Sequence, residues 1–107
     1  VSRFDFILEM LFNLSEIRRS NADDLLKQGI AYEDGDGVEQ DFTHAAELYK
    51  QAADLGNAEA MRLLGNLYYV GKGINQDYNK AKEYFESAAI AGELEAMAYL
   101  GLAYWGG

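Results

Sequence analysis

Apolar and small residues recur three and four positions apart along most of the chain, which is the spacing of one face of an α-helix. The clearest set occurs three times: Leu25, Gly29 and Tyr32; Met61, Gly65 and Tyr68; and Met97, Gly101 and Tyr104. The copies are separated by 36 residues. A fixed period of this length indicates an internal repeat in which every unit contributes a similar helix.

Each unit contains signals for a second helix after a glycine turn. Gly35 and Gly37 follow the first helix, and glycine tolerates the positive φ at which a helix often ends. Asp41 then precedes an alanine-rich helical pattern, so its carboxylate is predicted to cap the second helix. Gly56 ends that helix, and the short connection that follows permits only an antiparallel reversal. The second unit repeats these signals at Gly71, Gly73, Asp77 and Gly92. The pattern therefore predicts an all-α chain of antiparallel helix pairs.

The glycine at the centre of each first helix predicts a close contact between helices. A glycine inside a helix costs about 1 kcal/mol relative to alanine, so its recurrence implies that a neighbouring helix approaches closely. The alanines of the second helix are expected to supply a flat surface for this contact: Ala45, Ala52 and Ala53, with their copies Ala81, Ala88 and Ala89. We interpret these repeated residues, with Tyr32 and Tyr68, as core and not as a ligand site.

The repeated pattern resembles the Sel-one-like repeat, a relative of the tetratricopeptide repeat. An alanine, a glycine and tyrosine, a glycine loop, an aspartate and a final alanine pair with glycine recur over residues 22–56 and 58–92. Tetratricopeptide units are 34 residues long and favour a proline near their end. This chain has the longer period, the additional glycine loop and no proline. The resemblance implies a right-handed α-solenoid that scaffolds protein complexes, commonly without catalysis.

The repeat register divides the chain into four parts. Residues 22–57 and 58–93 are predicted to be two complete repeats, and residues 94–107 the first helix of an incomplete third. Residues 1–21 are expected to be an amino-terminal capping helix or a degenerate repeat helix. The open carboxyl-terminal end, with Tyr104 and Trp105, is expected either to continue in a longer protein or to meet a neighbouring molecule.

The amino-terminal segment follows the repeat register only in part. Phe6 aligns with Phe42, whereas Glu9 and Glu16 occupy positions that hold alanine in the repeats. The segment is also rich in bulky apolar residues, which could pair with another chain.

Composition narrows the range of partners. The chain of 107 residues has 18 acidic and 9 basic side chains, a net charge of −9 and no cysteine. Nucleic acids and anionic membrane surfaces select clustered Lys and Arg, so neither is an expected partner. The missing cysteines exclude disulfides, thiolate metal sites and cysteine nucleophiles. No apolar run reaches the roughly 20 residues that cross a bilayer, and the cellular compartment is not indicated.

Three candidate sites fail on spacing or context. The acidic loop from Glu33 to Asp41 suggests a calcium site, but counting from Asp34 puts Val38 and Ala45 where an EF-hand needs oxygen ligands. The loop glycines follow a helix, whereas a phosphate-binding loop follows a strand. His44 is replaced by Lys80 in the second repeat, which indicates an exposed helix position. We therefore predict no enzymatic activity, cofactor or metal, and interpret the loop as a solvated acidic face or a surface for a basic partner.

Positions that differ between repeats point to a recognition surface. They form one trio on each first helix: Leu26, Ile30 and Glu33; Arg62, Asn66 and Tyr69; and Ala98, Leu102 and Trp105. Spacings of four and three place each trio on one face, offset from the repeated packing face. Stacked repeats would align these faces, and we call the nine residues the recognition strip. Within it, Arg62, Tyr69 and Trp105 are of the types that dominate interface hot spots.

The strip predicts a module that binds a protein or peptide, with ordinary solvent exposure as the other explanation of its variability. The alternative function is a structural or self-associating repeat module without a separate ligand.

Overall fold

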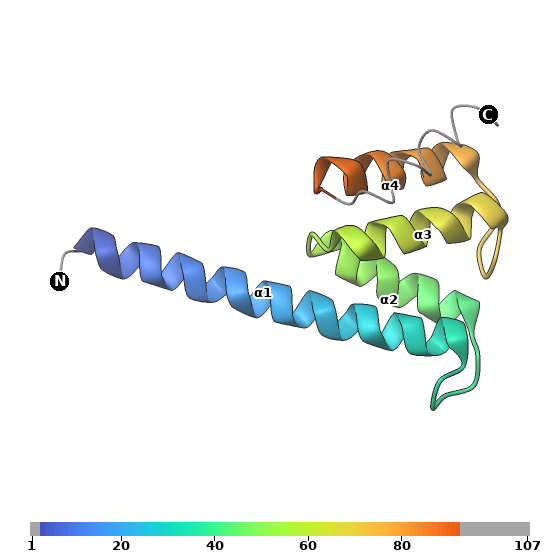
Figure 1. Cartoon of the computed structure of the whole chain (residues 1–107), viewed down its shortest axis with the longest axis horizontal. Coiled ribbons are helices and arrows are strands. Elements are labelled where there is room, and N and C mark those ends of the chain that lie inside the picture. The colour runs from blue at the N-terminus through green and yellow to red at the C-terminus, as the bar shows by residue number, and fades with distance from the viewer. Residues whose placement is uncertain (1–2, 93–107) are drawn as a thin grey trace.

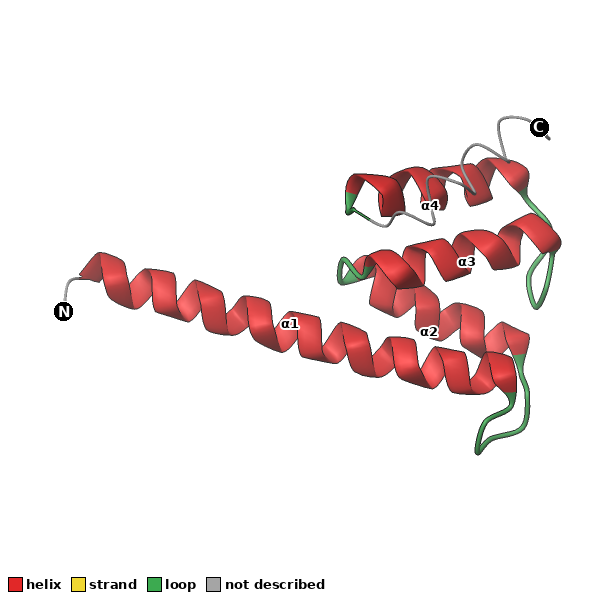
Figure 2. Cartoon of the chain, viewed as in Figure 1, coloured by secondary structure: helices red, strands yellow, loops and turns green. Residues whose placement is uncertain are grey.

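The computed structural model describes residues 3–92, and this part of the chain forms four α-helices and no strand (Figures 1 and 2). The helices are α1 (Arg3–Asp34), α2 (Phe42–Asp54), α3 (Ala58–Val70) and α4 (Tyr78–Ile90). α1 packs on α2, α2 on α3, and α3 on α4, so each helix contacts the one that follows it in the chain. The prediction of an all-α solenoid of antiparallel helix pairs is confirmed. Within the described residues, no helix has the length and apolar character needed to cross a membrane.

The helix ends lie where the local signals predict them. The Asp41 side chain accepts a hydrogen bond from the His44 backbone N–H at 3.0 Å, and Asp77 caps α4 in the same way through Lys80 at 3.1 Å. Gly71 closes α3 with a φ of +75°, in the left-handed region that glycine adopts without strain. The cap and turn residues therefore set where these helices begin and end.

The glycines inside the first helices lie against aromatic rings. A Cβ atom on Gly29 would stand 2.5 Å from Cε1 of Tyr49, and one on Gly65 would stand 2.7 Å from Cε1 of Phe85. The predicted close approach of the helices is thus confirmed, but its nearest atoms belong to these rings and not to the alanines. At Gly65 the carbonyl oxygen of Ala81 also lies close, at 3.2 Å from the same point. Both rings are fully buried, and they fix the spacing within each helix pair.

The first helix is longer than the repeat register predicts. A separate capping or degenerate helix was expected over residues 1–21, but α1 runs without a break from Arg3 to Asp34. The turn after α2 uses Gly56 at a φ of +95°, whereas the equivalent position holds Ser20, whose side chain disfavours that conformation. The helix therefore continues through Ser20. Its amino-terminal half extends away from the other helices, and every residue from 3 to 21 is exposed (Figure 1).

Candidate protein-binding surface

In repeat 1, the structure places the recognition strip at the edge of the core. Leu26 is only 8% exposed and belongs to the core cluster, so the expectation that it lies on a recognition face is wrong for this residue. Ile30 is half-buried and packs against the same cluster. Glu33 is half-buried near the end of α1. The accessible part of the strip in this repeat consists of Ile30 and Glu33.

The Glu33 carboxylate has a structural partner. Its Oε2 accepts a hydrogen bond from the hydroxyl group of Tyr49, whose ring is buried against Gly29. Burial raises the pKa of Tyr49, and the hydrogen bond with Glu33 raises it further because both favour the neutral hydroxyl. The buried hydroxyl is therefore neutral and satisfied, and part of the Glu33 carboxylate is committed to the fold.

Repeat 2 replaces both members of this pair. Tyr69 stands at the position of Glu33, and Phe85 stands at the position of Tyr49. Phenylalanine has no hydroxyl group, so it needs no acceptor on α3. Comparison of each position with its own copies in the other repeat does not reveal the pair of Glu33 and Tyr49. The signal in the sequence is that both of these positions change between the two repeats.

The strip residues of repeat 2 are half-buried. The side chain of Arg62 is 13% exposed, and its Nη2 lies 3.8 Å from Oε1 of Glu59. Asn66 and Tyr69 retain partial exposure, and the Tyr69 ring packs at 5.1 Å from the ring of Tyr78. These contacts hold the side chains in place before any partner binds, which lowers the entropy that binding would remove.

The third trio lies outside the described residues. Ala98, Leu102 and Trp105 belong to it, as does the open end with Tyr104 that was considered for self-association.

The acidic loop of repeat 1 is fastened to the end of α1 while its carboxylates face solvent. Gln40 donates through Nε2 to the carbonyl oxygen of Glu33 at 2.8 Å, and Gln76 makes the same bond to Tyr69 at 2.9 Å. This shared bond explains why the glutamine recurs. Besides the cap residue Asp41, three acids between Glu33 and Asp41 are exposed: Asp34, Asp36 and Glu39. Among the described residues, no group of three or more His, Cys, Asp or Glu is arranged to hold a metal ion.

His44 packs onto an aromatic ring. Its ring centre lies 4.1 Å from that of Tyr32, and its Nδ1 lies 4.0 Å from Oε2 of Glu47. In repeat 2, Lys80 places its Nζ 5.5 Å from the centre of the Tyr68 ring. The two residues therefore cover the same tyrosine position, which is a packing role.

A second surface was not anticipated from the sequence. Tyr68 lines three neighbouring hollows, which it shares chiefly with Lys50, Lys80 and Ile74. Its ring stacks on Tyr84 with a centroid distance of 5.8 Å. Tyr68 was assigned to the core because it recurs at the packing position, so its partly exposed edge was overlooked.

The repeat pattern agrees with a known family model. The model of the Sel1 repeat matches residues 29–57, 58–93 and 94–107. The chain belongs to the Sel1 repeat family. Sel1 repeats are in general protein-interaction modules in proteins that are typically non-catalytic.

Solved structures resemble this Sel1 repeat chain over most of its length. A Sel1 repeat protein from Oxalobacter formigenes is 35% identical with a TM-score of 0.72, covering 78% of this chain and 34% of its own. A protective antigen of uropathogenic Escherichia coli with an SLR fold is 32% identical with a TM-score of 0.77, covering 78% of this chain and 18% of its own. Cysteine-rich protein B of Helicobacter pylori is 30% identical with a TM-score of 0.71, covering 74% of this chain and 59% of its own.

The chain matches only part of each of these solved proteins. The chain spans between 18% and 59% of the length of the three solved proteins. No curated protein matches it significantly. Unlike a cysteine-rich relative, this chain contains no cysteine, so disulfides do not stabilise its repeats.

Proposed function

We propose that this Sel1 repeat chain is a non-enzymatic scaffold module that binds a protein or peptide along the recognition strip. In this proposal the repeats begin at residues 22, 58 and 94. The binding residues are Ile30 and Glu33 of α1 and Arg62, Asn66 and Tyr69 of α3, with Ala98, Leu102 and Trp105 continuing the strip in the third repeat. Leu26 is left out because it is buried.

One observation carries this proposal. The residues that hold the helices together are repeated in kind, as with Gly29 and Gly65, whereas the strip positions hold a different residue in each repeat. The strip side chains of the described residues are partly exposed, so their identity is not dictated by packing alone. Solenoids bind partners through such extended surfaces.

The charge of the chain favours a basic partner segment. The exposed carboxylate of Asp34 lies at the last residue of α1, next to Glu33, and those of Asp36 and Glu39 lie in the loop that follows. A Lys-rich or Arg-rich segment on the strip would be attracted by this loop, and its binding would weaken as salt screens the charges.

A peptide-display selection on the immobilised chain would test the proposal, with affinities of the recovered peptides measured by biolayer interferometry. We expect Tyr69→Ala to weaken binding at least tenfold, because a preorganised aromatic residue is a typical hot spot. Tyr84→Ala is the matched control, since Tyr84 is a half-buried tyrosine that lines a Tyr68 hollow outside the strip. Peptides that lose affinity with the Tyr84 variant and not with the Tyr69 variant would refute the strip.

The second candidate function is self-association without a separate ligand. It is favoured by the exposed apolar half of α1. Molar mass measured against protein concentration distinguishes it from a monomeric binding module.

A further inference from the structure

The amino-terminal half of α1 carries an unusual amount of exposed apolar surface. Nine large apolar side chains between residues 4 and 17 are 45% to 69% exposed: Phe4, Phe6, Ile7, Leu8, Met10, Leu11, Phe12, Leu14 and Ile17. Contiguous exposed apolar surface of this kind is typical of an interaction site. Comparison of this segment with the equivalent residues 36 positions later indicates which surface it would pack on.

The contact between α2 and α3 provides the template. A hollow at their interface is lined by Ala46 and Lys50 of α2 and by Leu64 and Tyr68 of α3. These residues mark the faces that meet when a second helix packs on the first helix of the next repeat. Thirty-six residues earlier, the same register pairs Met10 and Leu14 with Gln28 and Tyr32.

In repeat 2 the glycine loop contacts the start of α2, whereas the equivalent loop of repeat 1 has no such contact among the described residues. In repeat 2, a Cβ on Gly73 would lie 2.5 Å from the backbone of Phe42, and Thr43 donates through Oγ1 to the Gly73 carbonyl oxygen at 3.0 Å. Gly37 is the equivalent of Gly73, and nothing described lies within 4 Å of its Cβ position. The equivalents of Phe42 and Thr43 are Phe6 and Ile7, at the start of the exposed segment.

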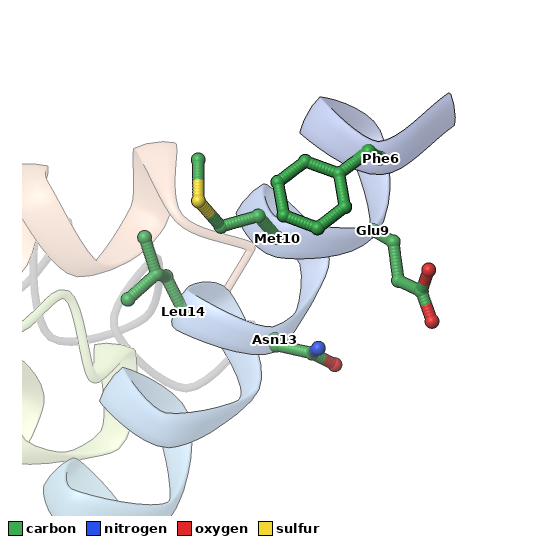
Figure 3. Close-up of a pocket in the computed structure, with 5 residues that line it drawn as sticks. All are labelled: Phe6, Glu9, Met10, Asn13 and Leu14. Carbon is green, nitrogen blue, oxygen red and sulfur yellow. The ribbon is translucent and has the colours of Figure 1, made fainter. Parts of the chain in front are cut away.

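The polarity of the segment matches a helix that packs on one side only. Ala45 and Tyr49 face the first helix of their own repeat and are fully buried. Their equivalents in the segment are Glu9 and Asn13, whose polar side chains suit contact with water. Figure 3 shows a hollow on α1 lined by Phe6, Glu9, Met10, Asn13 and Leu14, in which the side chains of Glu9 and Asn13 point away from those of Met10 and Leu14. By the repeat register, Met10 and Leu14 therefore lie on the side that packs on the first helix of the next repeat. Glu9 and Asn13 lie on the other, water-facing side.

The segment cannot reach repeat 1 of its own chain while α1 is straight. Folding back would need a turn such as that at Gly56, which has a φ of +95°. Ser20 occupies this position, and its side chain disfavours a positive φ. A second copy of the chain avoids the turn, because exchange of an identical element leaves each helix intact.

We propose that two copies of this chain form a symmetric dimer in which their α1 helices lie antiparallel and cross near Ser20. The segment of residues 6–18 in each copy then covers the first helix of repeat 1, residues 22–34, in the other. The contact continues the α2–α3 interface one repeat further toward the amino terminus. On the covered helix the contact is centred on Gln28 and Tyr32, whereas the accessible strip residues of that helix are Ile30 and Glu33.

Analytical ultracentrifugation of the whole chain tests the dimer. We expect twice the monomer mass of 11.9 kDa in the micromolar range. The double variant Met10→Asp/Leu14→Asp should be a monomer with its helix content retained by circular dichroism. The matched variant Glu9→Gln/Asn13→Gln, on the polar side, should remain a dimer. A wild-type chain that is monomeric at every concentration, or a dimer that survives the Met10/Leu14 change, overturns the proposal.

Spin labelling tests the antiparallel register. The chain has no cysteine, so Ser20→Cys and Lys27→Cys each provide one labelling site. Because the helix rises 1.5 Å per residue, the separation of the two labels along the axes of an antiparallel pair should grow by about 3 Å for each residue away from the crossing. Ser20 should therefore give the shorter distance of the two. Equal distances, or a longer distance at Ser20, contradict the crossing.

The turn variant Ser20→Gly distinguishes exchange from folding back. Glycine permits the positive φ, so this variant should shift the equilibrium toward monomers in which the segment covers its own repeat 1. If wild-type and Ser20→Gly chains are equally dimeric, Ser20 does not hold the helix straight and the exchange is refuted.

Discussion

The contact between Gly65 and Phe85 gives a prediction whose sign can be worked out from the structure. Gly65→Ala should gain about 1 kcal/mol from helix propensity. The added Cβ, however, would lie 2.7 Å and 2.8 Å from two carbons of the Phe85 ring, whereas carbon atoms prefer about 3.5 to 4.0 Å. The ring must move by nearly 1 Å in a site where it is fully buried, and overpacking of this kind costs about 1 to 3 kcal/mol. The net effect is a destabilisation of about 0 to 2 kcal/mol.

A double-mutant cycle isolates the contact. In a Phe85→Leu background the ring carbons are absent, so Gly65→Ala should become neutral or stabilising, apart from the Ala81 carbonyl oxygen at 3.2 Å. Urea unfolding followed by circular dichroism measures the four free energies. We expect the cost of Gly65→Ala to fall by about 1 to 3 kcal/mol in the Phe85→Leu background. The reasoning is refuted if Gly65→Ala stabilises the wild-type chain by about 1 kcal/mol, or if its effect is the same in both backgrounds.

The pair Glu33 and Tyr49 and the cap at Asp77 yield three further predictions. Glu33→Ala should lower the free energy of unfolding by about 1 to 3 kcal/mol, because it leaves a buried hydroxyl without its acceptor. In urea titrations this loss should be smaller in a Tyr49→Phe background. Equal losses in the two backgrounds would contradict the hydrogen bond between Glu33 and Tyr49. Burial and Glu33 raise the pKa of Tyr49, so the folded chain keeps a proton that the unfolded chain loses near pH 10. The stability advantage of wild type over Tyr49→Phe should therefore decrease above pH 10, by up to about 1.4 kcal/mol per pH unit, and a constant difference between pH 9 and pH 11 would argue against a buried neutral hydroxyl. Asp77→Ala should lower the free energy of unfolding by about 1 kcal/mol through loss of the helix cap, while Asp77→Asn should retain most of the stability. Calorimetry that ranks the two variants in the opposite order would show that the cap is unimportant.

The sequence predicted the elements whose signals are local. Glycine turns, aspartate caps and the three-and-four spacing of apolar residues act within a few positions, so the positions of α2, α3 and α4 could be read from the chain. The close approach at Gly29 and Gly65 was also predicted, because an internal glycine is otherwise unfavourable in a helix. The identity of the facing group was not, since Tyr49 and Phe85 lie 20 positions further along and no local signal links them.

The remaining differences arise from contacts between elements. Leu26 was placed on the strip by its helical angle, but α1 packs against α2 at a depth that buries this position. α1 continues through Ser20, which replaces the glycine that follows the other second helices, Gly56 and Gly92. A repeat alignment detects that substitution, but only the backbone shows that the helix continues through it. The recognition strip itself stays a prediction until a partner is bound to it.

The paired change from Glu33 and Tyr49 to Tyr69 and Phe85 constrains how this gene can recombine. A crossover between the glycine loops within the two repeats, which follow α1 and α3, would join α1 to a copy of α4, and would place the Glu33 carboxylate beside a phenylalanine ring that has no proton to donate. The reciprocal product would leave the Tyr49 hydroxyl without its carboxylate acceptor. Exchange of whole repeats keeps each pair together and avoids both defects. New units in this chain should therefore arise by copying complete helix pairs, with breakpoints between repeats and not within them.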